Sequence, residues 1–139
     1  MLKPIALSEG HYECRSLDET LPIFTELLAA QVIERTEHQA TVKHPNTEWR
    51  LVIHEAGPNA KNKPHTNHYG FRVANSKEIP KAHEYISAHK EQYKIKSVTT
   101  PHEAHFAYSI YFKEPGGNDL EIEYYNPAAI RQGRKIAAP

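Results

Sequence analysis

Two stretches of the chain have mostly apolar residues at the spacing of one helical face. They are Leu21, Phe24, Leu27 and Leu28 in the first half, and Ile79, Ala82, Ile86 and His89 in the second. Asp18 and Ser76 are placed to cap these helices at their N-termini. The following prolines, Pro22 and Pro80, would then lie in the first helical turn, where a missing N–H costs little. The pattern predicts two short helices at corresponding places in the two halves.

The residues around these helices are also repeated. The run His-Tyr-Glu-Cys-Arg at 11–15 precedes the first helix, and His-Tyr-Gly-Phe-Arg at 68–72 precedes the second. Each helix is followed by shorter runs of alternating character, which end with residues 49–55 in the first half and 120–125 in the second. The sequence therefore predicts one strand, one helix and three strands, repeated once.

Each of these halves is too small to bury a core alone, so we expect the two to pair. The predicted fold class is α+β, with two paired βαβββ units forming a curved mixed sheet around a cleft. The units cover about residues 8–56 and 66–126 of a single domain that spans residues 1–139. Ala56 to Thr66 is polar and reads as the linker. The C-terminal tail, residues 127–139, is expected to be loosely ordered or to lie over the cleft mouth or a partner chain.

The composition excludes some functions. Seventeen basic residues balance seventeen acidic ones, and a pI of 7.2 leaves no excess positive charge for nucleic acid or anionic lipid. No run of about 20 apolar residues is present, so a cytoplasmic protein is the expectation. The single cysteine, Cys14, cannot form an intrachain disulfide. Ten histidines in 139 residues raise the prospect of a metal or acid-base site.

The most informative stretch runs from Thr100 to Glu121. Glu-Pro-Gly-Gly-Asn at 114–118 has the composition of a turn and would join two strands. In the second strand, side chains alternate, so Glu121, Glu123 and Tyr125 share one face. Two carboxylates there would be ordinary on a solvated face, and Glu121 alone would not indicate a site.

Taken together, the repeat and this stretch resemble the vicinal oxygen chelate superfamily (glyoxalase, bleomycin resistance and dioxygenase proteins). The spacing of His102, Tyr111, the Glu-Pro-Gly-Gly turn at 114–117 and Glu121 is similar to the signature of type I extradiol catechol dioxygenases. The resemblance covers about residues 8–126. It implies that the cleft is a metal cleft.

By this resemblance His11, His68 and Glu121 are the metal ligands. Two imidazoles and one carboxylate leave positions open on Fe(II) for substrate and dioxygen, although Mn(II) or another divalent metal is also compatible. His102 and Tyr111 would hydrogen-bond the substrate hydroxyl that ionises. His54 would act as an acid-base group near dioxygen. The implied function is a non-haem extradiol dioxygenase that opens a catechol-type ring.

Other readings remain open at this stage. Aligning the repeats places Val52 where a fourth ligand would lie, and valine cannot bind a metal, which favours three ligands over the four of related isomerases. His54 could still replace that ligand or lie at the cleft rim. The alternatives are a non-redox isomerase or lyase of the glyoxalase type, and a metal-free module that binds an antibiotic or metabolite. One-module relatives tend to be dimers, so a homodimer or higher oligomer is expected.

Overall fold

The structure is a computed structural model that describes residues 2–3, 5–62 and 67–133 of the chain. It divides into two compact units, Met1–Asn62 and Lys63–Pro139, called unit 1 and unit 2 below. The predicted linker contains residues 63–66, which lie outside the described residues, and so does the end of the tail, residues 134–139.

Unit 1 is a four-stranded mixed sheet with one helical segment. The first strand pairs in parallel with the last, and the other pairings are antiparallel, which gives the order β1-β4-β3-β2. Its elements are β1 (Glu9–Cys14), α1 (Leu17–Pro22), the π-helical turn η1 (Ile23–Leu27), β2 (Gln31–Arg35), β3 (Gln39–Lys43), β4 (Arg50–Glu55) and the 3-10 turn η2 (Gly57–Asn59).

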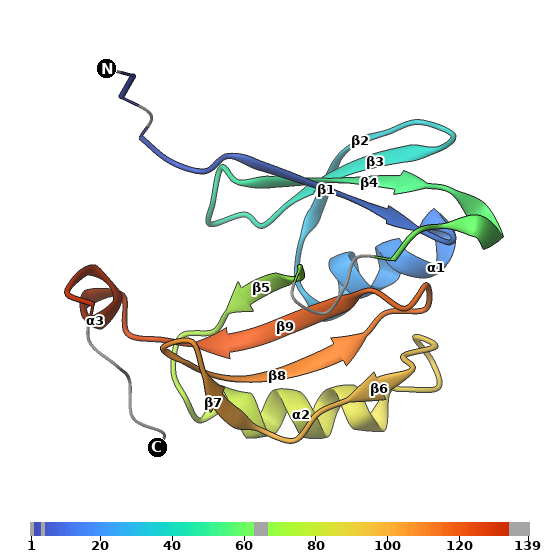
Figure 1. Ribbon diagram of the computed structural model, residues 1–139. Coiled ribbons are helices and arrows are strands. Elements are labelled where there is room, and N and C mark those ends of the chain that lie inside the picture. The colour runs from blue at the N-terminus through green and yellow to red at the C-terminus, as the bar shows by residue number, and fades with distance from the viewer. Residues whose placement is uncertain (1, 4, 63–66, 134–139) are drawn as a thin grey trace. The chain divides into compact units, whose positions relative to one another are not determined.

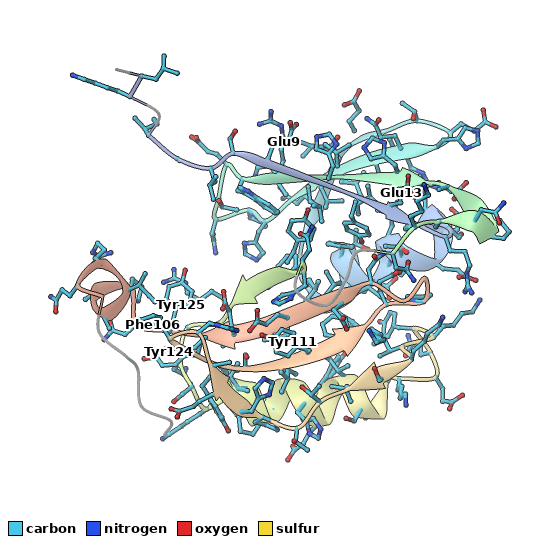
Figure 2. All side chains as sticks on the ribbon, viewed as in Figure 1. Glu9, Glu13, Phe106, Tyr111, Tyr124 and Tyr125 are labelled. Atoms are coloured by element: carbon cyan, nitrogen blue, oxygen red, sulfur yellow. The ribbon has the colours of Figure 1, made fainter. Side chains whose placement is uncertain are left out.

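The core of unit 1 lies between α1 with η1 and one face of this sheet (Figure 1). Phe24 and Ile23 of η1 are fully buried, as is Ile53 of β4. Because side chains alternate along β1, Tyr12 and Cys14 face the core while His11 faces the other way. Glu9 and Glu13, labelled in Figure 2, alternate with Tyr12 and Cys14 along β1 and so lie on the same side of the sheet as His11. This second side is the polar face of unit 1.

Unit 2 repeats this plan with one additional short strand. The first strand again pairs in parallel with the last, the order is β5-β9-β8-β6, and β7 also pairs with β8. Its elements are β5 (Tyr69–Arg72), α2 (Glu78–Ala88), β6 (Ser97–Val98), β7 (His102–Ala104), β8 (Ala107–Lys113), β9 (Asp119–Tyr124) and α3 (Pro127–Arg131).

The helix α2 covers one face of the sheet in unit 2 (Figure 1). Ile79 and Ile86 on α2 are buried, together with Ile110 of β8 and Leu120 of β9. The residues of β8 and β9 with the opposite parity, including Tyr111 and Glu121, lie on the other face. This face is the polar face of unit 2.

The α+β class and the repeated strand-helix-strand pattern are confirmed, whereas several details of the helices differ from the prediction. Ser16, not Asp18, is the N-cap of α1, and its hydroxyl accepts a hydrogen bond from the Glu19 N–H. Lys77 precedes α2 and makes no side-chain cap, so Ser76 is not the cap either. Pro22 ends α1 instead of lying in its first turn.

The beginning of the C-terminal tail is also more ordered than the sequence suggested. Residues 127–131 form α3, whose N-cap Asn126 accepts a hydrogen bond from the Ala128 N–H at 2.9 Å. Ala129 of this helix is buried. A proline at the first helical position after an Asn cap accounts for a helix there.

Candidate functional site

The polar face of unit 2 brings His68 and Glu121 together. His68 directly precedes β5, and Gly70 of β5 pairs with Glu121 of β9. His68 Nε2 lies 3.1 Å from Glu121 Oε2, and only 9% of the Glu121 side chain is exposed. A carboxylate is rarely so buried unless it is paired, and the imidazole of His68 is the partner here.

Two further predicted residues extend this pair into a row of side chains. Tyr111 of β8 lies opposite Glu121 in the sheet. The rings of His68 and Tyr111 make an edge-to-face contact, with their centroids 4.8 Å apart. The rings of Tyr111 and His102 are stacked at 5.3 Å. Tyr111 therefore stands between the two histidines, on the strand labelled β8 in Figure 1 and with its side chain labelled in Figure 2.

The turn between β8 and β9 fixes the register of these side chains. The Gly117 N–H donates to the Glu114 carbonyl at 2.8 Å, and the φ of Gly117 is +99°, a conformation that favours glycine. The buried Glu114 carboxylate accepts hydrogen bonds from both the backbone and the side-chain amide of Asn118. The predicted Glu-Pro-Gly-Gly-Asn turn is thus a tightly bonded hairpin that places Tyr111 beside Glu121.

Burial and neighbouring charge alter the ionisation of two groups on this face. Burial raises the pKa of Tyr111 to about 12, and the charge of Glu121 and a hydrogen bond to it act in the same direction. Tyr111 therefore keeps its proton at neutral pH and can donate it in a hydrogen bond. Burial also raises the pKa of Glu123 to about 7, and the Glu121 carboxylate adds to the effect. His68 and Arg72 partly oppose this second effect.

The polar face of unit 1 carries the other two predicted histidines. His11 Nδ1 lies 2.9 Å from His54 Nε2, and the two rings are stacked. On its other side, His11 Nε2 lies 3.3 Å from Glu9 Oε2. The Glu9 pKa is lowered, chiefly by its hydrogen bond with His11. In many metal-binding histidines, one ring nitrogen binds the metal and the other donates a hydrogen bond to a carboxylate.

The strand registers change the comparison between the two halves. In unit 1, His11 lies opposite Val52, whereas in unit 2 the residue opposite Glu121 is Gly70, two positions after His68. Glu121 thus lies opposite the residue two positions after His68. The residue opposite the position two after His11 is His54, so His54 and not Val52 corresponds to Glu121. The contacts agree, because each first-strand histidine meets the corresponding side chain of the last strand, His54 or Glu121. The alignment of the two sequence repeats had placed Val52 at this position, which is two residues before His54 on the same face of the strand.

Each of these pairs has a separation suited to binding one metal ion. Two ligands at bond lengths of about 2.1 Å lie about 3.0 Å apart when they subtend a right angle at the ion. The 3.1 Å between His68 and Glu121 and the 2.9 Å between His11 and His54 are both close to that value. Within the described part of the chain, no group of three or more His, Cys, Asp or Glu side chains is close enough together to hold an ion. A common site for His11, His68 and Glu121 stays a prediction.

Glu9 and Gly70 also belong to these surroundings, although no sequence motif singled them out. Glu9 lies two residues before His11 and so faces the same way along the strand. Gly70 lies two residues after His68 and faces the two carboxylates of β9. The period of two along a strand could have identified both positions once the histidines had been singled out. Nothing in the sequence indicated how close Gly70 would be to the carboxylates.

Comparison with known proteins gives a family and a fold. Residues 11–122 match the sequence profile described as Glyoxalase/Bleomycin resistance protein/Dioxygenase superfamily. No curated protein is similar enough in sequence to count as a match.

Several solved structures share the fold. A possible glyoxalase from Bacillus cereus has a TM-score of 0.68 at 17% identity, and the match covers 86% of this chain and 99% of that one. A lactoylglutathione lyase from Agrobacterium tumefaciens has a TM-score of 0.63 at 17% identity, over 88% and 95% of the two chains. An antibiotic-binding protein from a Streptomyces species has a TM-score of 0.62 at 11% identity, over 91% and 100%. At such low identities these similarities show the fold alone. The family profile spans most of the sequence, and the chain therefore belongs to the glyoxalase/bleomycin resistance protein/dioxygenase superfamily.

Proposed function

We propose that this protein is a non-haem iron(II) extradiol dioxygenase that opens a catechol-type ring. The observation that carries the proposal is the continuous row of contacts from Glu121 through His68 and Tyr111 to His102. Three of these four residues belong to the extradiol-type signature, and they come from neighbouring strands. The His68–Glu121 pair could bind a metal ion, and the protonated Tyr111 phenol beside it could donate a hydrogen bond to a substrate oxygen that ionises as it binds the metal.

In this proposal His68, Glu121 and His11 hold the metal. The His68–Glu121 separation fits two adjacent ligands of one ion, and Glu9 orients the ring of His11. Two imidazoles and a carboxylate form the ligand set that suits Fe(II), and Mn(II) or another divalent metal is compatible with it. When bound, iron(II) would supply the redox chemistry that activates dioxygen toward the catecholate.

The neighbouring side chains would bind the substrate and move its protons. Tyr111 remains protonated because its pKa is raised to about 12, so its hydroxyl can donate a hydrogen bond to the ionised substrate oxygen. His102, stacked on Tyr111, is the second donor. His54 would lie near the dioxygen site and act there as an acid-base group.

The second candidate is a non-redox isomerase or lyase of the glyoxalase type, which would bind its metal through four protein ligands. It is favoured by the 2.9 Å contact between His11 and His54, because His54 could then be the fourth ligand. A metal-free binding module is the third candidate. The fold does not distinguish the three, since a lactoylglutathione lyase and an antibiotic-binding protein are similarly close to this chain in structure.

Substrate and assembly follow from the leading candidate. The partners would be a small aromatic diol and dioxygen, and the protein would act as a homodimer or a higher homo-oligomer. Balanced charge gives no attraction to nucleic acid. None of the helices in the described residues has the length and apolar character needed to span a bilayer.

Metal analysis and dioxygen uptake test the proposal. Protein loaded with iron without air should hold about one iron per chain and consume dioxygen with 3-substituted or bicyclic catechols, forming a yellow ring-opened product. No uptake with any of these catechols would reject the dioxygenase. Retention of zinc, manganese or nickel without uptake would favour the isomerase, whereas a folded protein that retains no metal would favour the binding module.

The Tyr111→Phe variant tests the assigned mechanism. It should keep iron and substrate binding but slow ring opening about 100-fold to 1000-fold, as expected for loss of one preorganised donor. Tyr108→Phe is the matched control, because Tyr108 lies on the same strand with its side chain on the opposite face. Equal turnover in wild-type protein and Tyr111→Phe would show that Tyr111 does not stabilise the ionised substrate.

A further inference from the structure

Gly70 is a glycine that the backbone does not require. It lies within β5, and the described glycines with positive φ are Gly57, Gly117 and Gly133. A glycine in the interior of a strand weakens it, and often marks a point where another group approaches closely. The reason for glycine at position 70 is therefore to be sought in the space around it.

That space is filled by two carboxyl groups. A Cβ atom at position 70 would lie 3.1 Å from Glu123 Oε1, 3.2 Å from Glu123 Cδ and 3.3 Å from Glu121 Oε2. These distances are shorter than ordinary contacts, so an added methyl group would force one or both side chains to move. Glu121 is buried and contacts His68, so any movement of its carboxylate breaks that contact.

We propose that Gly70 and Glu123 are matched positioning residues for the Glu121 carboxylate. Glycine at position 70 leaves room for Glu123 to lie over β5, and Glu123 fills the space into which Glu121 could otherwise rotate. Together they keep Glu121 Oε2 beside His68 Nε2. The inference rests on the proposed function, in which Glu121 and His68 are metal ligands.

This pairing predicts compensation between substitutions. In Gly70→Ala the new methyl group competes with the Glu123 side chain, and Glu121 is pushed from its position beside His68. In the double variant Gly70→Ala/Glu123→Ala, the methyl group at position 70 takes over the space that the Glu123 side chain filled. The second substitution therefore repairs the effect of the first.

The test measures the affinity for manganese(II) alone, by electron paramagnetic resonance, in wild-type protein and the variants. Gly70→Ala should bind manganese about 10-fold more weakly, and Gly70→Ala/Glu123→Ala should return to within about 3-fold of wild type. Gly70→Ala/Glu123→Gln is the matched control, because glutamine keeps the shape of the side chain and removes its charge. It should remain as weak as Gly70→Ala. Its recovery would overturn the proposal, because charge repulsion and not packing would then be the cause.

A second measurement does not depend on metal. In metal-free protein, Gly70→Ala should lower the Tm by a few degrees when Glu123 is present or replaced by Gln, and should not lower it in the Glu123→Ala background. If wild-type protein binds no manganese, the proposed metal site fails, and the Tm pattern still decides whether residues 70 and 123 are matched. If Gly70→Ala changes the Tm equally in all three backgrounds, the pairing fails whether or not metal binds.

Discussion

The raised pKa of Glu123 predicts that unit 2 loses stability as the pH rises through neutrality. Burial, with the neighbouring Glu121 carboxylate, raises this pKa from 4.5 to about 7. The folded protein therefore favours the protonated acid. The stability that this preference contributes is fully present below pH 4.5 and is lost as the pH rises through 7. Replacing Glu123 by glutamine, which stays neutral, removes this loss.

The size of the effect follows from the two pKa values. At about 1.36 kcal/mol per pH unit, a rise from 4.5 to about 7 corresponds to at most about 3.4 kcal/mol. Because the Glu123 side chain is partly exposed, solvent screening reduces this to about 1–2 kcal/mol. Most of the change falls between pH 5 and pH 8, since the unfolded chain ionises first.

Urea denaturation of chelator-treated protein at pH 5, 6, 7 and 8 measures this difference. Glu123→Gln should gain about 1–2 kcal/mol over wild type between pH 5 and pH 8, with an unchanged m-value. Glu84→Gln makes the same charge change at an exposed position of α2 and reports the effect of charge alone. A difference between wild type and Glu123→Gln that is constant with pH, or that shrinks as the pH rises, would refute the reasoning from burial.

Three further predictions concern metal binding and stability. Glu121→Ala should abolish iron retention in elemental analysis. Glu123→Ala, which removes a positioning side chain but no ligand, should lose only a minor part of the iron, and the reverse result would mean that Glu123 is the ligand. Phe24→Ala should lower the free energy of unfolding by about 3–5 kcal/mol in urea titrations, because Phe24 is fully buried. Removing residues 127–139 should leave iron binding unchanged and lower the Tm slightly, because Ala129 is buried; loss of folding would place the tail in the core.

Most of the fold could be predicted from the periodic spacing of apolar residues, because such a pattern depends on many residues at once. One residue that departs from the pattern changes neither the helix predicted around Phe24 nor the strand predicted around Glu121. A helix cap depends on one hydrogen bond, and Ser16 and Asp18 are equally good caps by residue type, so the sequence could not choose between them.

The sequence predicted which side chains of the candidate site share a face of a sheet, but it predicted less well which of them are paired. The spacing of His102, Tyr111 and Glu121 predicted neighbours that the strands do bring together, because one short turn joins β7 to β8 and another joins β8 to β9. The alignment of the two repeats favoured Val52 over His54 as the counterpart of Glu121, since a shift of two residues leaves every side chain on the same face. Parity can be read from sequence, whereas register depends on backbone pairing over a long separation.

The parallel pairing of the first strand with the last in each unit has a consequence for how the chain folds. β1 can pair only after β4 has been synthesised, and β5 can pair only after β9 has been synthesised. Such long-range closure is slow, because the entropy of the intervening loop is lost before the contacts form. During synthesis on the ribosome, the first strand of each unit therefore stays unpaired until the last strand of that unit has been made. We expect the whole chain to refold more slowly than a helical protein of the same length, which stopped-flow fluorescence would measure.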